Sequence, residues 1–114
     1  MQIYRSSHSE QLLFNDARHA NTFLSRFKGL LGSNGLDCGQ ALLITPCNSV
    51  HTIGMRFPID IAFLDRQGKI LKLVHNLKPQ KLSMKKQAAC VLEMPVNSIE
   101  KHKLELGESL SWSE

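Results

Sequence analysis

Short apolar runs bounded by Gly, Pro, Ser, Asn or Asp cover most of the chain. This pattern is typical of strands, because a strand needs only a few apolar residues before a turn residue ends it. The pattern predicts seven or eight short strands. The runs are residues 1–5, 11–20, 41–45, 49–53, 59–65, 69–74, 88–94 and 108–112.

Two segments have helical spacing instead. In residues 20–32 the apolar residues recur at intervals of three and four, which lines one face of a helix. They are Phe23, Leu24, Phe27, Leu30 and Leu31. Asn21 or Thr22 can cap its start. A second, shorter amphipathic helix is predicted over residues 97–103, with Ser98 as a capping residue.

Residues 59–65 and 69–74 predict a hairpin, since Gly68 in the short connection supplies a residue that tolerates positive φ. Residues 76–86 predict an exposed loop, because Pro79 and several lysines interrupt the apolar pattern. Together the elements predict an α+β protein of mainly antiparallel β structure. We expect a small curled sheet or partly closed barrel, with one main helix across an opening and one short helix.

The chain has 114 residues, of which 42% are hydrophobic and 21% charged, close to average globular usage. We therefore expect a single domain over residues 1–114. Its three cysteines are an odd number without Cys-x-x-Cys spacing, as in proteins of reducing compartments. No apolar run approaches the roughly 20 residues of a membrane span, and residues 1–10 lack a secretory signal. These features indicate a cytoplasmic protein that does not bind a membrane.

Lysines gather in residues 69–86, which contain six lysines and no Asp or Glu in a chain of net charge +4. Such a segment could attract acidic partners. It lacks the arginines and interleaved aromatic rings of a nucleic-acid surface, since Phe63 is the only bulky ring near it. We expect a solvated edge strand and loop there and no nucleic-acid partner.

Sulfur and imidazole donors recur at intervals of four in Cys47, His51 and Met55. This donor set suits a soft metal such as Cu(I). In a strand, four residues span about 13 Å, so these side chains share an ion only if the chain bends at Gly54 or if Cys90 replaces one ligand. We favour packing on one face, with no resident metal and no cofactor.

Nucleophilic catalysis is the other chemistry open to this segment. Cys47 would be the nucleophile and His51 the base, with Asp60 or Asp65 orienting the imidazole. No strained nucleophile elbow or oxyanion hole is evident around them. A cysteine and a histidine a few residues apart are a frequent coincidence, so packing is again favoured.

Asp60 interrupts the apolar segment Phe57–Leu64. A carboxylate there is expensive to bury unless it is paired or accepts backbone donors. Arg26 and Arg56 are candidate partners. We favour a buried tether between helix and sheet over an anion-binding or acid–base site.

Several sequence segments together resemble the bacterial and archaeal family called domain of unknown function 192 (DUF192). They are Arg26–Gly32, Ala41–Asp65, Gly68–Ile70 and Val91–Glu93, within a resemblance over about residues 15 to 112. The matching positions are Arg26, Gly29, Met55, Pro58, Asp60, Asp65 and Gly68. Cys47-x-x-Val50-His51-Thr52 marks a variant form, since other relatives have Phe-Trp before the methionine. The resemblance implies a compact β-rich domain without an assigned activity.

We therefore expect a small bacterial binding or accessory module rather than an enzyme. Its ligand or partner groove would use Arg26, Cys47, His51, Met55, Arg56 and Asp60. The partner is a small ligand or a protein whose identity the sequence leaves open, as it leaves open the oligomeric state. The alternative is a thiol- or metal-dependent enzyme, or a soft-metal binding protein, centred on Cys47, His51 and Asp60.

Overall fold

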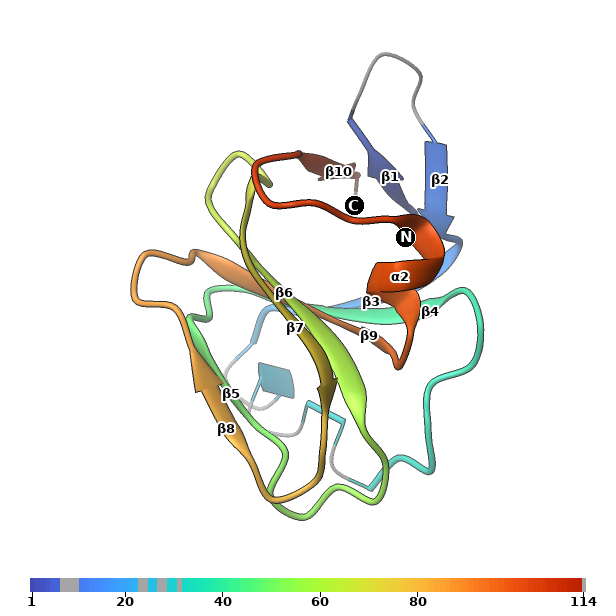
Figure 1. Ribbon diagram of the computed structural model, residues 1–114, viewed down its shortest axis with the longest axis vertical. Coiled ribbons are helices and arrows are strands. Elements are labelled where there is room, and N and C mark those ends of the chain that lie inside the picture. Colours follow the sequence, from blue (N-terminus) through green and yellow to red (C-terminus); the bar gives the residue numbers. More distant parts are fainter. Residues whose placement is uncertain (7–10, 23–24, 27–28, 31, 114) are drawn as a thin grey trace.

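The computed structural model describes residues 1–6, 11–22, 25–26, 29–30 and 32–113, in which strands predominate (Figure 1). The strands are β1 (Ile3–Arg5), β2 (Gln11–Phe14), β3 (Asp16–Ala20), β4 (Gln40–Ile44), β5 (Ser49–His51), β6 (Ile59–Leu64), β7 (Ile70–Leu77), β8 (Leu82–Met84), β9 (Cys90–Pro95) and β10 (Leu110–Trp112). The helix is α2 (Ser98–His102). This is the β-rich chain that the short apolar runs predict.

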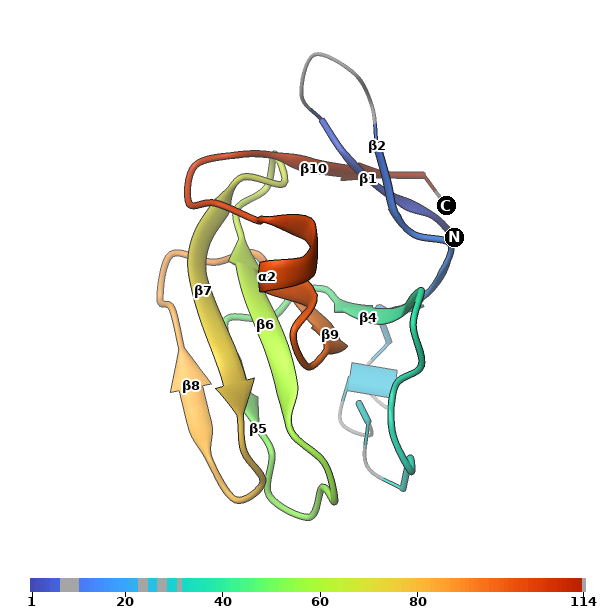
Figure 2. The same cartoon turned by 45° about the vertical axis from the view of Figure 1, so that its right-hand side comes forward.

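A five-stranded sheet of order β3-β4-β9-β6-β7 forms the centre of the molecule. Its pairs are antiparallel except for β3 with β4, which is parallel. A three-stranded sheet, β10-β1-β2, and a two-stranded sheet, β5-β8, lie on different sides of it (Figures 1 and 2). The described strands thus form three sheets with open edges and no closed barrel.

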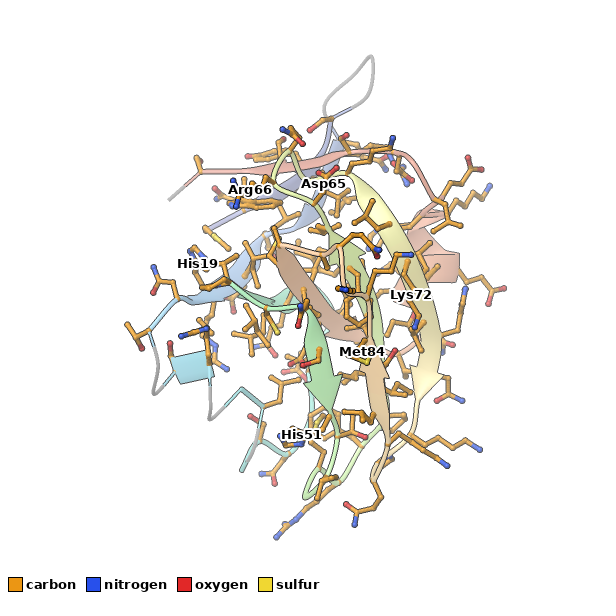
Figure 3. All side chains as sticks on the ribbon, turned by 90° about the vertical axis from the view of Figure 1, so that its left-hand side faces the viewer. His19, His51, Asp65, Arg66, Lys72 and Met84 are labelled. Carbon is orange, nitrogen blue, oxygen red and sulfur yellow. The ribbon has the colours of Figure 1, made fainter. Side chains whose placement is uncertain are left out.

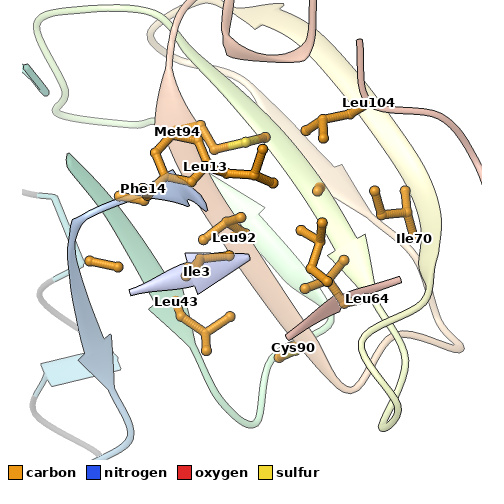
Figure 4. Packing of buried hydrophobic residues seen from close by; sticks show 14 of the residues in the cluster. Ile3, Leu13, Phe14, Leu43, Leu64, Ile70, Cys90, Leu92, Met94 and Leu104 are labelled. Atoms are coloured by element: carbon orange, nitrogen blue, oxygen red, sulfur yellow. The ribbon is translucent and has the colours of Figure 1, made fainter. Parts of the chain in front are cut away.

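The two faces of the central sheet bury different side chains, because successive residues of a strand point to opposite faces. On one face Cys90, Leu92 and Met94 of β9 pack with residues of β1, β2, β10 and α2 (Figure 4). Val91, on the opposite face, packs with Val50, Ile61 and Phe63 beneath β5 and β8. We call these the α2 face and the β5 face. Each has its own apolar cluster, so the sheet separates two environments.

The predicted hairpin is confirmed as β6 and β7. Asp65 closes its turn, since Oδ1 accepts the backbone N–H groups of Gln67 and Lys69, both at 2.9 Å. Gly68 has φ +81°, and a Cβ there would lie 2.2 Å from the Leu110 carbonyl oxygen. The glycine is therefore required by β10, which crosses the turn closely, as well as by the turn itself.

Residues 11–20, which the apolar pattern predicts as a single strand, form two strands in different sheets. The break falls at Asn15, which lies between β2 and β3 and is followed by a second polar residue, Asp16. Before it, Leu13 and Phe14 are buried on the α2 face, and after it β3 pairs with β4. The single-strand prediction is wrong because two consecutive polar residues end one burial pattern and start another.

Residues 76–86 are not wholly a loop, since β8 pairs with β5. Thr52, which is fully buried, joins the two segments. Its Oγ1 donates to the Lys78 carbonyl oxygen at 2.6 Å and accepts from Lys81 N at 2.9 Å, and its own N–H donates to the Lys81 carbonyl oxygen at 2.8 Å. The apolar pattern does not predict β8, because this strand has three residues and the bonds of Thr52 beside it are polar.

The predicted main helix has Phe23, Leu24, Phe27 and Leu31 outside the described residues. Within them, Arg26 N donates to Thr22 O at 2.9 Å and Gly29 N to Ser25 O at 3.0 Å, which is helical spacing. The predicted short helix is confirmed as α2, although its N-cap is Asn97, not Ser98. No helix among the described residues is long and apolar enough to cross a bilayer.

Candidate functional site

A cavity of about 310 Å³ opens on the β5 face of the central sheet. Its walls come from the end of β4, the loop that follows, β5, and the helical turn around Arg26 and Gly29. Four of the residues expected in a groove line this cavity: Arg26, Cys47, His51 and Met55. The volume lies at the small end of the range for ligand pockets.

Glu93 on β9 lies at the floor of this cavity. The residue is 3% exposed, between Leu42 of β4 and Ile61 of β6, and burial raises the pKa of its carboxyl from 4.5 to about 7. Its Oε1 has no hydrogen-bond partner among the described residues. Because a buried carboxyl oxygen without a partner is costly, Oε1 of Glu93 is the most unusual polar feature of the pocket.

Cys47 is half-buried in the pocket wall, and its thiol donates to the Ser49 carbonyl oxygen at 3.0 Å. Burial raises the pKa of the Cys47 thiol, as does the nearby Glu93 carboxylate, while hydrogen bonding by the Ser49 backbone and the Arg26 guanidinium lower it. Burial also raises the pKa of Cys90, on the α2 face, to about 12. Both groups are therefore thiols at neutral pH, not the thiolates that nucleophilic chemistry needs.

Arg26 reaches the pocket from the helical turn. Its Nη1 donates to the Pro46 carbonyl oxygen at 3.1 Å and its Nε to the Thr22 carbonyl oxygen at 3.4 Å. A guanidinium has five N–H donors, so these two bonds leave donors for a ligand. The contact with Pro46 fixes the cation against the loop that forms the pocket wall.

His51 and Met55 occupy different parts of the rim. His51 is exposed at the end of β5, beside the strand β8 that carries Met84 (Figure 3). Met55 is 8% exposed and belongs to an apolar cluster with Ile44 and Leu30. The three donors at intervals of four thus lie around one cavity. Within the described ranges, no group of three or more His, Cys, Asp and Glu side chains is placed to share a metal ion.

Asp60 and Arg56, also expected in the groove, are not among the residues that line the pocket. Arg56 is exposed in the turn before β6. Asp60 is 1% exposed, and its Oδ1 accepts from Asn76 N at 2.8 Å while Oδ2 accepts from Ile99 N at 2.9 Å. The carboxylate therefore ties β6 to β7 and to the first turn of α2. The predicted buried tether between a helix and the sheet is thus confirmed, but its partners are backbone groups of β7 and α2, not the candidates Arg26 and Arg56.

The sequence reasoning missed Glu93 as a site residue. The signal was present, because a lone carboxylate stands inside the apolar run Ala88–Met94 just as Asp60 stands inside its own. Only the register of β9 between β4 and β6 places Glu93 over a cavity. In the sequence, Glu93 otherwise belongs to the segment Val91–Glu93, which resembles the DUF192 family.

The basic segment 69–86 runs along β7 and β8. Lys69, Lys78, Lys81 and Lys86 are exposed. Lys72 instead donates to the Met84 carbonyl oxygen at 3.0 Å and lies 5.6 Å from the centre of the Phe63 ring, which is fully buried. This part of the surface offers positive charge without a stacking platform for bases.

Curated relatives are archaeal. A UPF0127 protein of Thermococcus kodakarensis is 30% identical over 98 residues, which cover 82% of this chain and 62% of that protein. A UPF0127 protein of Pyrococcus furiosus is 30% identical over 104 residues, covering 86% of this chain and 87% of that protein. The chain therefore spans about three fifths of the length of the Thermococcus relative and most of the Pyrococcus one.

A solved structure is similar in fold. It is a protein of unknown function from Novosphingobium aromaticivorans, with a TM-score of 0.85 and 16% sequence identity over 98% of this chain and 84% of that one. At this identity the likeness concerns the fold alone. Residues 4–112 match the DUF192 family, which is described as "Uncharacterized ACR". Nearly the whole sequence is included in that match, and the chain belongs to the DUF192 family of UPF0127 proteins.

Proposed function

We propose that this chain is a small binding module, acting as one domain over residues 1–114, whose pocket on the β5 face takes a small organic ligand. The observation that carries the proposal is the buried carboxyl of Glu93, whose Oε1 has no partner in the part of the chain that the structure describes and which lines a cavity of about 310 Å³. A ligand that supplies the missing partner would relieve the cost of burying this group. Arg26, Cys47, His51 and Met55 supply the walls.

The thiol or metal alternative has less support. Asp60, one of its three residues, points to the α2 face and has backbone partners on both oxygens. Cys47 is a partly buried thiol with a raised pKa. We expect it to react with iodoacetamide at neutral pH more slowly than the exposed Cys38. Faster labelling of Cys47, or stoichiometric copper or zinc in protein purified without added metal, would favour the alternative.

Binding is tested by NMR. A ¹⁵N-labelled chain is mixed, at millimolar concentration, with glycerol, glucose, acetate, propylamine, glycine and γ-aminobutyrate in turn. We expect at least one compound to give saturable shifts confined to the pocket residues. Asn48→Trp, at an exposed position on the pocket wall, should abolish them. Ser113→Trp, exposed and outside this pocket, should not. No localised shift with any compound would contradict the proposal.

Archaeal relatives do not establish the source of this chain, and its cytoplasmic location remains a prediction. A protein partner at the same groove, and the absence of nucleic-acid binding, likewise remain predictions. In the NMR experiment, addition of a short DNA duplex tests the predicted absence of nucleic-acid binding. We expect any shifts that the duplex causes to disappear at moderate salt. Exposed lysines without a shaped site attract DNA only through their charge, and salt screens that attraction.

A further inference from the structure

The pocket holds two groups of opposite charge that do not meet. Among the described residues the ion pair is that of Arg5 with Glu108, at 2.7 Å, so Arg26 and Glu93 are farther apart than direct contact. Both line the same cavity, and both act on the Cys47 thiol that lies in its wall. The space between a guanidinium and a carboxyl is therefore the space that a ligand would occupy.

The guanidinium suits an anionic group. Arg26 is held at Pro46 and Thr22 by two of its five donors, which leaves the others for a carboxylate. The floor suits a cation or a strong N–H donor. Glu93 has Leu42 and Ile61 as cross-strand neighbours, neither of which can donate a hydrogen bond from its side chain.

We propose that the pocket binds a small zwitterion of the amino-acid type, whose carboxylate pairs with Arg26 and whose ammonium group pairs with the ionised carboxylate of Glu93. This inference rests on the proposed function and specifies the class of ligand. A compound with both charges satisfies the two pocket groups at once, whereas a singly charged compound leaves one of them without a partner. The small volume favours a compound of few carbon atoms.

Because Glu93 must lose its proton when the ligand binds, the proposal predicts that affinity changes with pH in a definite direction. The pKa of free Glu93 is about 7, so below that pH its carboxyl holds a proton that must leave to solvent when an ammonium group binds. Affinity should therefore rise with pH, up to about ten-fold per unit, and level off above pH 7. The other ionisable groups that line the cavity are Arg26, the Cys47 thiol and His51.

The experiment is calorimetric titration with glycine, β-alanine, γ-aminobutyrate and 5-aminovalerate, which separate the two charges by increasing distances. Acetate and propylamine carry one charge each. We expect one zwitterion to bind at least about ten-fold more tightly than either, because each singly charged compound loses one charge-assisted contact. His51→Gln should leave the rise of affinity with pH in place, because the proposal assigns that rise to Glu93.

Glu93→Gln should weaken binding of the preferred zwitterion at least about ten-fold and remove its pH dependence, and Arg26→Met should weaken it similarly. Matched controls are Glu105→Gln and Arg56→Met, exposed residues outside the pocket that should change nothing. Equal affinity for acetate or propylamine, or affinity that falls as pH rises, would overturn the zwitterion while leaving a binding pocket. If none of the NMR probes binds either, the proposed function fails as well.

Discussion

Asp60 and Glu93 lie on the neighbouring strands β6 and β9 of the same sheet, and each interrupts a buried apolar run. They are almost equally inaccessible, at 1% and 3% exposed. Asp60 points to the α2 face, where the N–H groups of Asn76 and Ile99 bind its two oxygens. Glu93 points to the β5 face, where Oε1 has no partner among the described residues and a cavity adjoins it.

The difference shows that a buried carboxyl can have either of two roles: it can join elements of the fold, or it can contact a ligand. On the α2 face, backbone N–H groups of β7 and α2 bind both oxygens of Asp60, so the group joins three elements of the fold. On the β5 face Oε1 of Glu93 has no hydrogen-bond partner among the described residues. Burial raises the pKa of this carboxyl, and the group adjoins a cavity that a ligand can enter. Burial alone therefore does not distinguish a tether from a site, whereas the hydrogen-bond partners do.

The largest effect is expected at Asp60. Asp60→Ala removes the acceptor of two N–H groups, one of them fully buried, and should lower the free energy of unfolding by about 3 to 5 kcal/mol. Urea denaturation measures the loss. Asp37→Ala, at an exposed position, is the control and should change stability by less than about 0.5 kcal/mol. A loss at Asp60 no greater than that of the control would mean that the carboxylate is not a tether.

Glu93→Gln should do the opposite and stabilise the chain. In the native state the carboxyl keeps its proton up to about pH 7, whereas the unfolded chain loses it near 4.5. The free energy of unfolding of the unaltered chain therefore falls as pH rises through this interval. At about pH 8 the glutamine variant should be more stable by about 2 to 3 kcal/mol, and below pH 4.5 the difference should vanish.

The measurement for Glu93 is urea denaturation at a series of pH values, with Glu105→Gln as the exposed counterpart. The control should follow the unaltered chain at every pH. A Glu93→Gln variant that is less stable than the unaltered chain at about pH 8 would show that the carboxylate has a favourable partner, which would remove the contrast with Asp60.

On the β5 face the fold is held by Thr52 rather than by a carboxylate. Thr52→Val keeps the shape but leaves Lys78 O and Lys81 N without their side-chain partner. We expect a loss of about 1 to 2 kcal/mol, less than at Asp60, because Lys78 and Lys81 are exposed and water can replace part of each bond. Hydrogen exchange should accelerate at the Lys81 amide. Unchanged exchange there would mean that the backbone bonds of Thr52 are sufficient.

The fold was predictable where the residues that determine an element lie within that element or its turn. The β6–β7 hairpin follows from Asp65 and Gly68, and α2 from its amphipathic spacing. The separation of β2 from β3 and the pairing of β5 with β8 depend on contacts between distant segments. An apolar pattern carries no information about such contacts.

The candidate site was predictable in part for a similar reason. Cys47, His51 and Met55 are close in sequence, so their presence around one cavity follows from a local bend. Whether a buried carboxyl is a tether or a pocket floor depends on which donors other elements bring to it. For Asp60 the sequence predicts the tether but not its partners, because the N–H groups that bind it come from β7 and α2. For Glu93 it does not predict the cavity, because the walls of that cavity come from distant segments.

The smallest effect is expected at Cys47, which has a counterpart on the opposite face. Cys90→Ala removes a sulfur that is 3% exposed in the cluster of the α2 face and should lower stability by about 1 to 2 kcal/mol. Cys47→Ala removes one that already adjoins a cavity, so fewer contacts are lost and the change should stay below about 0.5 kcal/mol. Denaturation of the two variants in parallel measures the difference. If Cys47→Ala were the more damaging, the wall of the pocket would be packed like a core, and the β5 face would have no space for a ligand.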